Sequence, residues 1–130
     1  MAHASKNTPL AKYTVLVAQG DAAVRRALRL LIAQDPRLHV IAEAAEAEML
    51  LAHPGLHCPH LLLLDWHLPG LRIGALLPAL RLLCPQTKVI ALSSRREIAQ
   101  AAEDIGADGF LDMSTPPDHL LPTVHRVLQD

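Results

Sequence analysis

The stretch Leu61-Leu62-Leu63-Leu64-Asp65-Trp66-His67-Leu68-Pro69-Gly70 decides the fold of this chain. A run of four leucines is typical of a strand buried on both faces, and the Pro-Gly pair predicts a turn just beyond it. One acidic residue, Asp65, stands where the apolar run stops. The stretch therefore predicts a buried strand that delivers a single carboxylate to a loop.

Composition indicates one globular domain. The 130 residues are 51% hydrophobic and 19% charged, and 12 basic residues nearly balance 13 acidic ones, which argues against nucleic-acid binding through bulk charge. Two cysteines are too few for a secreted disulfide scaffold. No apolar run has the length of a membrane span, and the N-terminal segment does not resemble a secretion signal. We expect a cytoplasmic protein with a disordered tail over residues 1–12 and a single domain over residues 13–130.

Strands and helices alternate along the chain. The predicted strands are Tyr13–Ala18, Leu38–Ala42, His60–Asp65, Lys88–Leu92 and Gly109–Asp112. The predicted helices are Asp21–Ile32, Ala44–Ala52, Gly74–Leu83, Arg95–Ile105 and Pro117–Leu128. Pro78 and Pro122 fall inside two of these helices, so each of the two helices either tolerates a proline or begins late, with the proline in its first turn.

Five such units with apolar strands predict an α/β fold, a doubly wound parallel sheet with helices on both faces. In these sheets ligands bind at the carboxyl ends of the strands. That edge selects the residues that follow the strands: Gln19, Gly20, Asp21, Asp65, Ser93, Ser94 and Met113.

From Thr14 to Leu128 the chain resembles the receiver domains of bacterial two-component response regulators. The resemblance depends on the Leu-Asp strand, on Leu68-Pro69-Gly70, on Val89-Ile90-Ala91-Leu92-Ser93-Ser94 and on Gly106-Ala107-Asp108-Gly109-Phe110-Leu111. The pair Val24-Arg25 in the first predicted helix also resembles the pattern of one branch of this family, whose receivers precede helix-turn-helix output domains. The resemblance implies a flavodoxin-like fold with strand order 2-1-3-4-5, and a phosphoryl-accepting carboxylate at Asp65.

The family's phosphorylation chemistry implies further groups around that acceptor. An acid pair after the first strand helps to hold Mg²⁺, a lysine after the fifth strand neutralises the phosphoryl group, and a hydroxyl after the fourth strand hydrogen-bonds to it. This chain has Ser93 at the hydroxyl position and Phe110 at the aromatic switch position. It has Gln19 and Gly20 in place of the acid pair.

Met113 stands in place of the lysine, and Arg72-Ile73 replaces the Asp-Gly that usually follows the turn. A lysine about 4 Å from a phosphoryl oxygen is worth roughly 4 kcal/mol at an effective dielectric of 20, and a divalent ion is worth more. Since phosphoryl transfer depends on such charges, the departures predict a degenerate receiver, a pseudo-receiver without metal or catalytic residues that acts through protein contacts.

Two other functions stay open. In the first, Asp65 is still phosphorylated, with Asp21 shifting towards Mg²⁺ and Arg72 replacing the missing cation; otherwise Asp21 caps the first helix and Arg72 is solvated. The second is a flavodoxin-like enzyme or nucleotide binder, which the single glycine of the first loop, Gly20, disfavours.

The expected partner surface is formed by the fourth helix, the fifth strand and the fifth helix, where family members dimerise or contact other domains. Its polar contacts are expected from Arg95, Arg96, Glu97, His119 and His125. The expected partners are a second copy, a histidine kinase or an output domain outside this chain, and not a membrane or a nucleic acid.

A cluster of potential Zn²⁺ ligands, made of His53, His57, Cys58 and His60, precedes the third strand. It lies at the opposite end of the sheet from Asp65, and its spacing fits an ordinary loop. Cys84 approaches Cys58 if the third and fourth strands are neighbours, but we expect two buried thiols and no disulfide.

Overall fold

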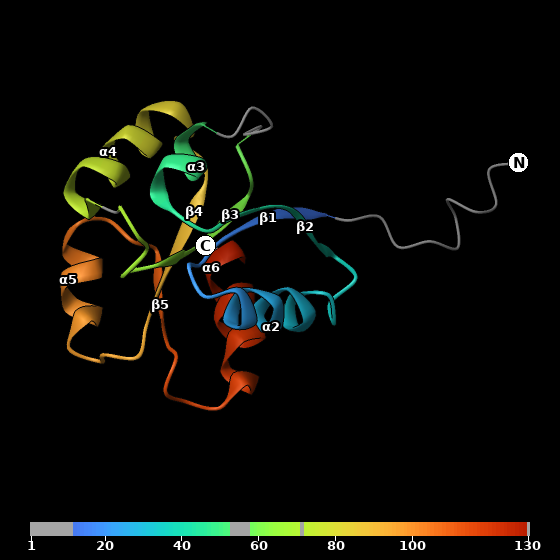
Figure 1. Ribbon diagram of the computed structural model, residues 1–130. Helices are drawn as coiled ribbons and strands as arrows, with labels where there is room; N and C mark the ends of the chain where they lie inside the picture. Colours follow the sequence, from blue (N-terminus) through green and yellow to red (C-terminus); the bar gives the residue numbers. More distant parts are fainter. Residues whose placement is uncertain (1–11, 53–57, 71, 130) are drawn as a thin grey trace, which may run out of the picture.

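The computed structural model describes residues 12–52, 58–70 and 72–129 and contains a five-stranded parallel sheet in the order β2-β1-β3-β4-β5 (Figure 1). This is the predicted order. The strands are β1 Tyr13–Ala18, β2 Leu38–Ala44, β3 Leu61–Asp65, β4 Lys88–Ser93 and β5 Gly109–Asp112. The helices are α2 Ala22–Ile32, α3 Ala47–Ala52, α4 Ile73–Leu83, α5 Ile98–Asp104 and α6 Leu120–Gln129, with a 3₁₀ turn over Pro117–His119.

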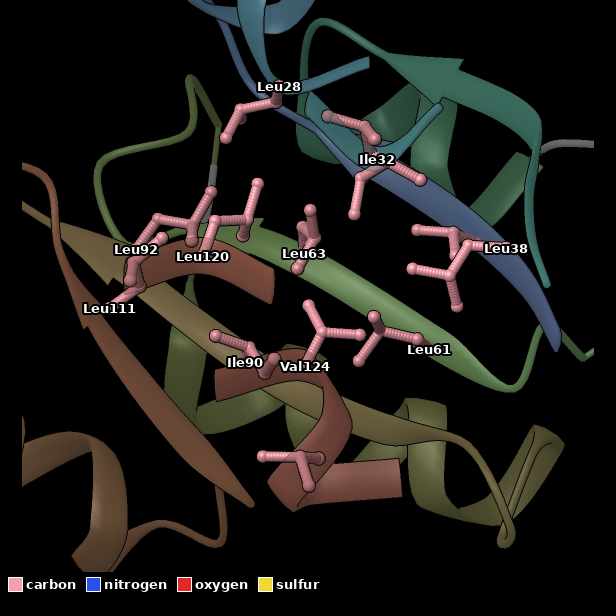
Figure 2. Packing of buried hydrophobic residues seen from close by; sticks show 13 residues of the cluster. Leu28, Ile32, Leu38, Leu61, Leu63, Ile90, Leu92, Leu111, Leu120 and Val124 are labelled. Carbon is pink, nitrogen blue, oxygen red and sulfur yellow. The ribbon is translucent and has the colours of Figure 1, made fainter. Parts of the chain in front are cut away.

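The leucines of β3 divide between two hydrophobic clusters, one on each face of the sheet. Leu61 and Leu63 pack in the cluster that contains residues of α2 and α6. Figure 2 shows this cluster, with the side chains of Leu28 and Ile32 from α2 and of Leu120 and Val124 from α6 labelled. Leu62 and Leu64 pack in the cluster with α3 and α4 residues. All four are at most 1% exposed, so the four-leucine run is explained by burial on both faces.

The edge strand β2 departs from the expected apolar pattern. It extends to Ala44, two residues further than predicted, because Ala18 of β1 pairs with Ala44 and Gln19 N–H donates to the Ala44 carbonyl at 2.9 Å. As a consequence α3 begins only at Ala47. His39 and Ile41 are exposed, as expected for a strand with a neighbour on one side only.

Helix α5 begins at Ile98, three residues later than predicted. The Arg95 N–H donates to the Ser93 hydroxyl at 3.0 Å, and Ile98 and Ala99 donate three residues back, to the carbonyls of Arg95 and Arg96. Serine side chains that bond nearby backbone amides offer the chain an alternative to helix, which explains the late start.

The two prolines are accommodated differently. Pro78 lies inside α4, which begins at Ile73, so the late-start alternative is wrong for this helix. Pro122 lies in the first turn of α6, where its missing N–H would have had no partner within the helix, and a 3₁₀ turn over Pro117–His119 precedes it.

One arginine of α2, Arg25, is partly buried. Its guanidinium donates to the Gln19 carbonyl at 2.7 Å and to a Glu43 carboxylate oxygen at 3.2 Å, and its side chain is 20% exposed. Arg25 therefore links α2 to the ends of β1 and β2. The other arginines of this helix, Arg26 and Arg29, are exposed.

At the amino end of the sheet, Cys58 and Cys84 form a disulfide with their Cα atoms 5.2 Å apart. The expectation of two buried thiols without a disulfide is therefore wrong: the cysteines are bonded and Cys58 is exposed, and only the burial of Cys84, which is 1% exposed, is confirmed. Parallel pairing of Leu61 with Lys88 brings together the segments that precede β3 and β4, and each segment carries one of the cysteines.

Three further predictions concern the N-terminal tail, the histidines that precede β3 and membrane-spanning helices. Residues 1–11 of the expected tail lie outside the described residues, while the Lys12 N–H donates to the Arg37 carbonyl at 2.8 Å, so Lys12 already belongs to the folded part. His53 and His57 also lie outside the described residues. His60 Nδ1 accepts from the Thr14 N–H at 3.0 Å. Among the described helices, none is long and apolar enough to cross a membrane.

Candidate functional site

The carboxyl edge of the sheet brings together the residues that the sequence selected. Ala18 pairs with Leu64, and Asp65 pairs with Leu92, so Gln19, Asp65 and Ser93 follow one another across three neighbouring strands. The Met113 N–H donates to the Ser93 carbonyl at 2.9 Å, which adds the end of β5 to this row. The candidate site is therefore a row of side chains along one edge, as expected for this fold.

Asp65 is half-buried at the end of β3. One of its carboxylate oxygens accepts a hydrogen bond from the His67 N–H at 3.0 Å, which closes a turn of the Asx type directly after the strand. No ion pair involves Asp65 among the residues that the structure describes. The half-buried Trp66 follows it, and the Trp66 N–H donates to the Leu92 carbonyl at 2.9 Å.

Ser93 is held by two neighbours. Its hydroxyl oxygen accepts from the Arg95 N–H at 3.0 Å, and His67 Nε2 lies 3.2 Å from the same oxygen. Ser93 is only 2% exposed, so the imidazole covers the hydroxyl on the side of the Asp65 loop. The side chain of the residue two positions after Asp65 therefore contacts the hydroxyl that, in the family, meets the phosphoryl group.

Gln19 stands at the first position of the acid pair and is 7% exposed. Its amide oxygen accepts from the Asp21 N–H at 3.1 Å, so the side chain folds back on its own loop. The backbone carbonyl of Gln19 accepts from Arg25, as described above. Both oxygens of this residue thus have partners within the β1–α2 segment.

Gly20 stands at the second position of the acid pair and packs against the turn that follows the acceptor. A Cβ atom at this position would lie 2.9 Å from Cδ and 3.3 Å from Cγ of Pro69. The Pro69 carbonyl accepts from the Ala47 N–H at 3.0 Å, so α3 holds this turn. Any side chain at residue 20 would therefore require the Pro69 ring or the backbone to shift.

Met113, at the lysine position, packs with the cluster between the sheet and helices α2 and α6. With Val24, Leu28 and Leu120 it also lines a pocket of about 180 Å³. Phe110, the aromatic switch position, lies on the other side of β5, where it lines a groove of about 250 Å³ together with Ala99 and Glu103 of α5. It is half-buried.

The two candidate substitutes have other contacts, and among the described residues neither forms an ion pair or hydrogen bond with Asp65. One carboxylate oxygen of Asp21 accepts from the Ala23 N–H at 2.8 Å and from the Val24 N–H at 3.1 Å, which is the geometry of an N-cap. Arg72 is exposed and lines a pocket of about 360 Å³ with residues of α3 and α4, among them Glu48.

The family's Mg²⁺ requires several oxygen ligands at close quarters. Over residues 12–52, 58–70 and 72–129, no group of three or more His, Cys, Asp or Glu side chains is arranged to hold a metal ion. The side chains at the acid-pair positions offer one amide oxygen that is already bonded and one glycine. The residues present do not fit the ligand set that the family uses.

The expected partner surface consists of α5, β5 and α6 and is called the α5–β5–α6 surface below. Arg95, Arg96 and Glu97 precede α5 with side chains 63%, 86% and 65% exposed. Arg96 Nε lies 3.6 Å from an Asp112 carboxylate oxygen. The pKa of Asp112 is lowered, mainly by hydrogen bonds from the Ser114 hydroxyl and N–H, so this carboxylate stays charged.

The two histidines expected on that surface differ. His119 is exposed in the 3₁₀ turn before α6. His125 Nε2 instead lies 2.6 Å from an Asp35 carboxylate oxygen and 3.0 Å from Arg37 Nη2, in the loop between α2 and β2. His125 therefore contacts the loop at the amino end of the sheet. The prediction that it contributes to the partner surface is not supported by these contacts.

Two residues of the site were missed by sequence reasoning. The sequence pattern assigns His67 only to the turn, although its place two residues beyond the strand-terminal Asp65 is a usable signal. Pro69 was recognised as a turn residue, but only the tertiary structure shows that its ring packs on Gly20.

Comparisons with known proteins agree with this fold. Residues 15–125 match the family described as response regulator receiver domain. The nitrate/nitrite response regulator protein NarL of Escherichia coli K12 is 30% identical over 115 residues, 87% of this chain and 53% of the relative. The chain thus spans about half the length of the curated relatives it matches.

Solved structures share the fold at lower identity. A LuxR-family response regulator from Aurantimonas sp. SI85-9A1 has a TM-score of 0.82 at 22% identity, covering 91% of this chain and 86% of that one. The receiver domain of the putative regulator NarL from Mycobacterium tuberculosis has a TM-score of 0.80 at 23% identity, covering 92% and 98%. Since the family match extends over most of the chain, this protein belongs to the response regulator receiver domain family.

Proposed function

We propose that this receiver domain transmits signals through protein contacts on the α5–β5–α6 surface, and that metal-dependent phosphorylation of Asp65 has been lost. The acceptor carboxylate remains at the end of β3, while the groups that would make it react are replaced by packed or hydrogen-bonded neutral residues.

The observation that carries the proposal is the contact between Gly20 and Pro69. A receiver that lost one acidic residue by a single substitution would keep room for it. Here the Pro69 ring lies 2.9 Å from where a Cβ atom of residue 20 would stand, and α3 holds the turn from behind. The second ligand position has been filled by a side chain, and Gln19 next to it is bonded within its own loop.

Loss of the cation supports the same conclusion. Met113 contributes to the apolar packing under α2 and α6. A phosphoryl group adds about −1.5 to −2 charges, which a site without a cation or a metal repels. Removal of both would slow the transfer by several powers of ten, because positioning and charge neutralisation make up nearly all of this catalysis.

Ser93 supports a signalling state that does not depend on a phosphoryl group. In the family the hydroxyl moves towards the phosphoryl oxygen, and the aromatic residue of the fifth strand changes rotamer. Here Arg95 N–H and His67 already contact the Ser93 oxygen. We infer that His67 holds Ser93 in one position and that Phe110 is a fixed part of the partner surface.

The proposed partners are a histidine kinase, an output domain outside this chain or a second copy, and the domain itself has no enzymatic role. These partners are proposed from the chain's membership in the response regulator receiver domain family. The exposed Arg95, Arg96 and Glu97 supply the polar contacts of this surface.

Trp66 makes the loss of phosphorylation directly testable, since it adjoins Asp65. We expect no saturable change in its fluorescence up to 10 mM Mg²⁺, and no mass increase of one phosphoryl group after incubation with acetyl phosphate. The Asp65→Asn variant is the control for phosphorylation elsewhere. Saturable quenching followed by an Asp65-dependent phosphoryl adduct would refute the proposal and favour the phosphorylated alternative.

The contact surface is tested separately. The variants Arg96→Glu and Phe110→Ala should weaken self-association, measured by analytical ultracentrifugation. Exposed Arg26 of α2 lies outside the surface, and Arg26→Glu serves as the matched control. Equal effects of Arg26→Glu and Arg96→Glu would contradict the proposed surface.

A further inference from the structure

We propose that Cys58 and Cys84 form a reversible redox site, in which a disulfide opens and closes between the segment entering β3 and the end of α4. This inference is independent of the proposed signalling function. It rests on the contacts that hold the two cysteines together, and on the different environments of their sulfur atoms.

Backbone contacts beside the cysteines keep them close whether or not they are bonded. The Thr87 N–H donates to the Cys84 carbonyl at 3.2 Å, and the Thr87 hydroxyl donates to the carbonyl of Pro59, the residue after Cys58, at 2.6 Å. Lys88 N–H then donates to the His60 carbonyl at 2.9 Å. The spacing of 5.2 Å between the two Cα atoms is thus maintained by the start of the β3–β4 ladder and lies within the range that a disulfide requires.

The reduced state has a place in the structure as well. Cys58 Sγ lies 3.3 Å from the Leu83 carbonyl oxygen. In the disulfide this sulfur carries no proton and the contact is one of packing, but a Cys58 thiol can donate a hydrogen bond there. Cys84 is buried among the residues of the α3–α4 cluster, where a small apolar thiol is accommodated. Neither state leaves a sulfur in an unsuitable environment.

Exposure determines the order of the chemical steps. The exposed Cys58 thiolate attacks one sulfur of a low-molecular-weight disulfide such as oxidised glutathione, and one glutathione thiolate leaves. The Cys84 thiolate then attacks Cys58 Sγ and displaces the second. The two cysteines lose two protons and two electrons in total, and the two glutathione thiols that form take them up.

The bond closes a loop of 26 residues in sequence that contains all of β3 and α4. It holds the final turn of α4 against the entry of β3, where Cys84 N–H also donates to the Leu80 carbonyl at 2.6 Å. Because cross-linking restricts the unfolded chain, the oxidised protein is expected to unfold at a higher temperature than the reduced one.

The test equilibrates the folded protein in buffers of varied reduced and oxidised glutathione, quenches with acid and labels with N-ethylmaleimide after denaturation. We expect the chain to change from two labels to none as the buffer becomes oxidising, while it stays monomeric on a non-reducing gel. Two labels in every buffer, no labels in the most reducing buffer, or disulfide-linked dimers would each overturn the proposal.

Single variants test the order of attack. With oxidised glutathione, Cys84→Ala should acquire one glutathione on Cys58, whereas Cys58→Ser should remain unmodified at the buried Cys84. The Cys58→Ser variant also removes the redox dependence of the unfolding temperature, and its exposed position keeps the fold intact. A redox-dependent unfolding temperature that persists in Cys58→Ser would contradict the bridge.

Discussion

The two ends of the sheet differ in how they are held together. At the amino end, Arg37 binds the buried Asp35 and Arg81 binds Asp108 through ion pairs of 3.0 Å and 2.9 Å, and a disulfide joins Cys58 to Cys84. At the carboxyl end, Gln19, Gly20, Met113 and the His67–Ser93 pair are joined by packing and hydrogen bonds. The ion pairs described at that end, such as Arg25 with Glu43, do not include Asp65.

This difference shows that the acidic residues of the family's carboxyl end are needed for metal binding and not for the fold. A receiver keeps acids close together at the carboxyl end because a metal ion binds them, and clustered carboxylates without such an ion repel one another. In this chain the positions of the acid pair and of the lysine hold Gln19, Gly20 and Met113, which are packed or hydrogen-bonded and carry no charge. We therefore expect that a return to family residues there costs stability, as does loss of charge at the amino end.

The largest effect is expected for Gly20→Asp. The new side chain must displace the Pro69 ring from 2.9 Å, and overpacking of this kind lowers the free energy of unfolding by about 2 kcal/mol. Urea denaturation measures it. The control is Gly74→Ala in α4, where nothing lies within 4 Å of the added Cβ and stability should be unchanged or slightly raised. An undiminished stability of Gly20→Asp would mean that the site retains room for the acid pair.

The next effect concerns the amino end. The Arg37 side chain and N–H, with His125, hydrogen-bond to Asp35 and hold the pKa of its carboxyl far below the ordinary value. Asp35→Asn should lower the free energy of unfolding at pH 7 by about 1–2 kcal/mol, the magnitude of hydrogen bonds to a charged group.

The pH dependence of this contribution has a definite sign. A carboxyl whose folded pKa is depressed stabilises the fold above its unfolded pKa of about 3.9, and that contribution disappears as pH falls towards the folded value. The difference between wild type and Asp35→Asn should thus be constant from pH 5 to 7 and smaller at pH 3, as measured by urea denaturation. A difference that grows on acidification would contradict this account.

A smaller effect distinguishes the two roles considered for Asp21. As an N-cap, Asp21→Ala should cost about 1 kcal/mol, while Asp21→Asn should retain most of the stability because its amide oxygen still accepts from Ala23 and Val24. Thermal denaturation of the three proteins checks this. If Asp21→Asn lost stability only in the presence of Mg²⁺, the carboxylate would be a metal ligand and the two ends of the sheet would be less different.

The smallest effect is expected for His67→Ala, which removes one contact to Ser93 on a partly exposed loop and should cost about 0.5 kcal/mol. Its consequence is local: the amide resonances of Ser93 and Phe110 should shift in NMR spectra, while those of β1 remain in place. His67→Gln, which can restore a hydrogen bond, is the matched variant. Unchanged Ser93 and Phe110 resonances in His67→Ala would show that the histidine does not hold the switch position.

Much of the fold followed from local patterns. β1 and β5 have the predicted bounds, and α4 differs from its prediction by one residue at its start, because apolar periodicity and turn residues are properties of short segments. The starts of α3 and α5 were wrong. The start of α3 depends on the pairing of Ala44 with Ala18, which are far apart in the sequence. The start of α5 depends on a local hydrogen bond from the Arg95 N–H to the Ser93 hydroxyl, which apolar periodicity does not reveal.

The candidate site divides in the same way. Asp65, Ser93, Gln19, Gly20 and Met113 were found from their places after strands, since parallel strands end at one edge. Their contacts were not predictable, because His67 meets Ser93 across 26 positions of sequence and Pro69 meets Gly20 across the sheet edge.

By itself, the sequence of this protein determined the α/β class, the family and the identity of the residues at the reactive edge, because these depend on residue type and spacing. The tertiary structure alone decided that Pro69 packs against the position of the second acid, that Arg25 bonds to Gln19 and His125 to Asp35, and that Cys58 meets Cys84. These are distances between segments, which arise only when the strands pair and the helices pack.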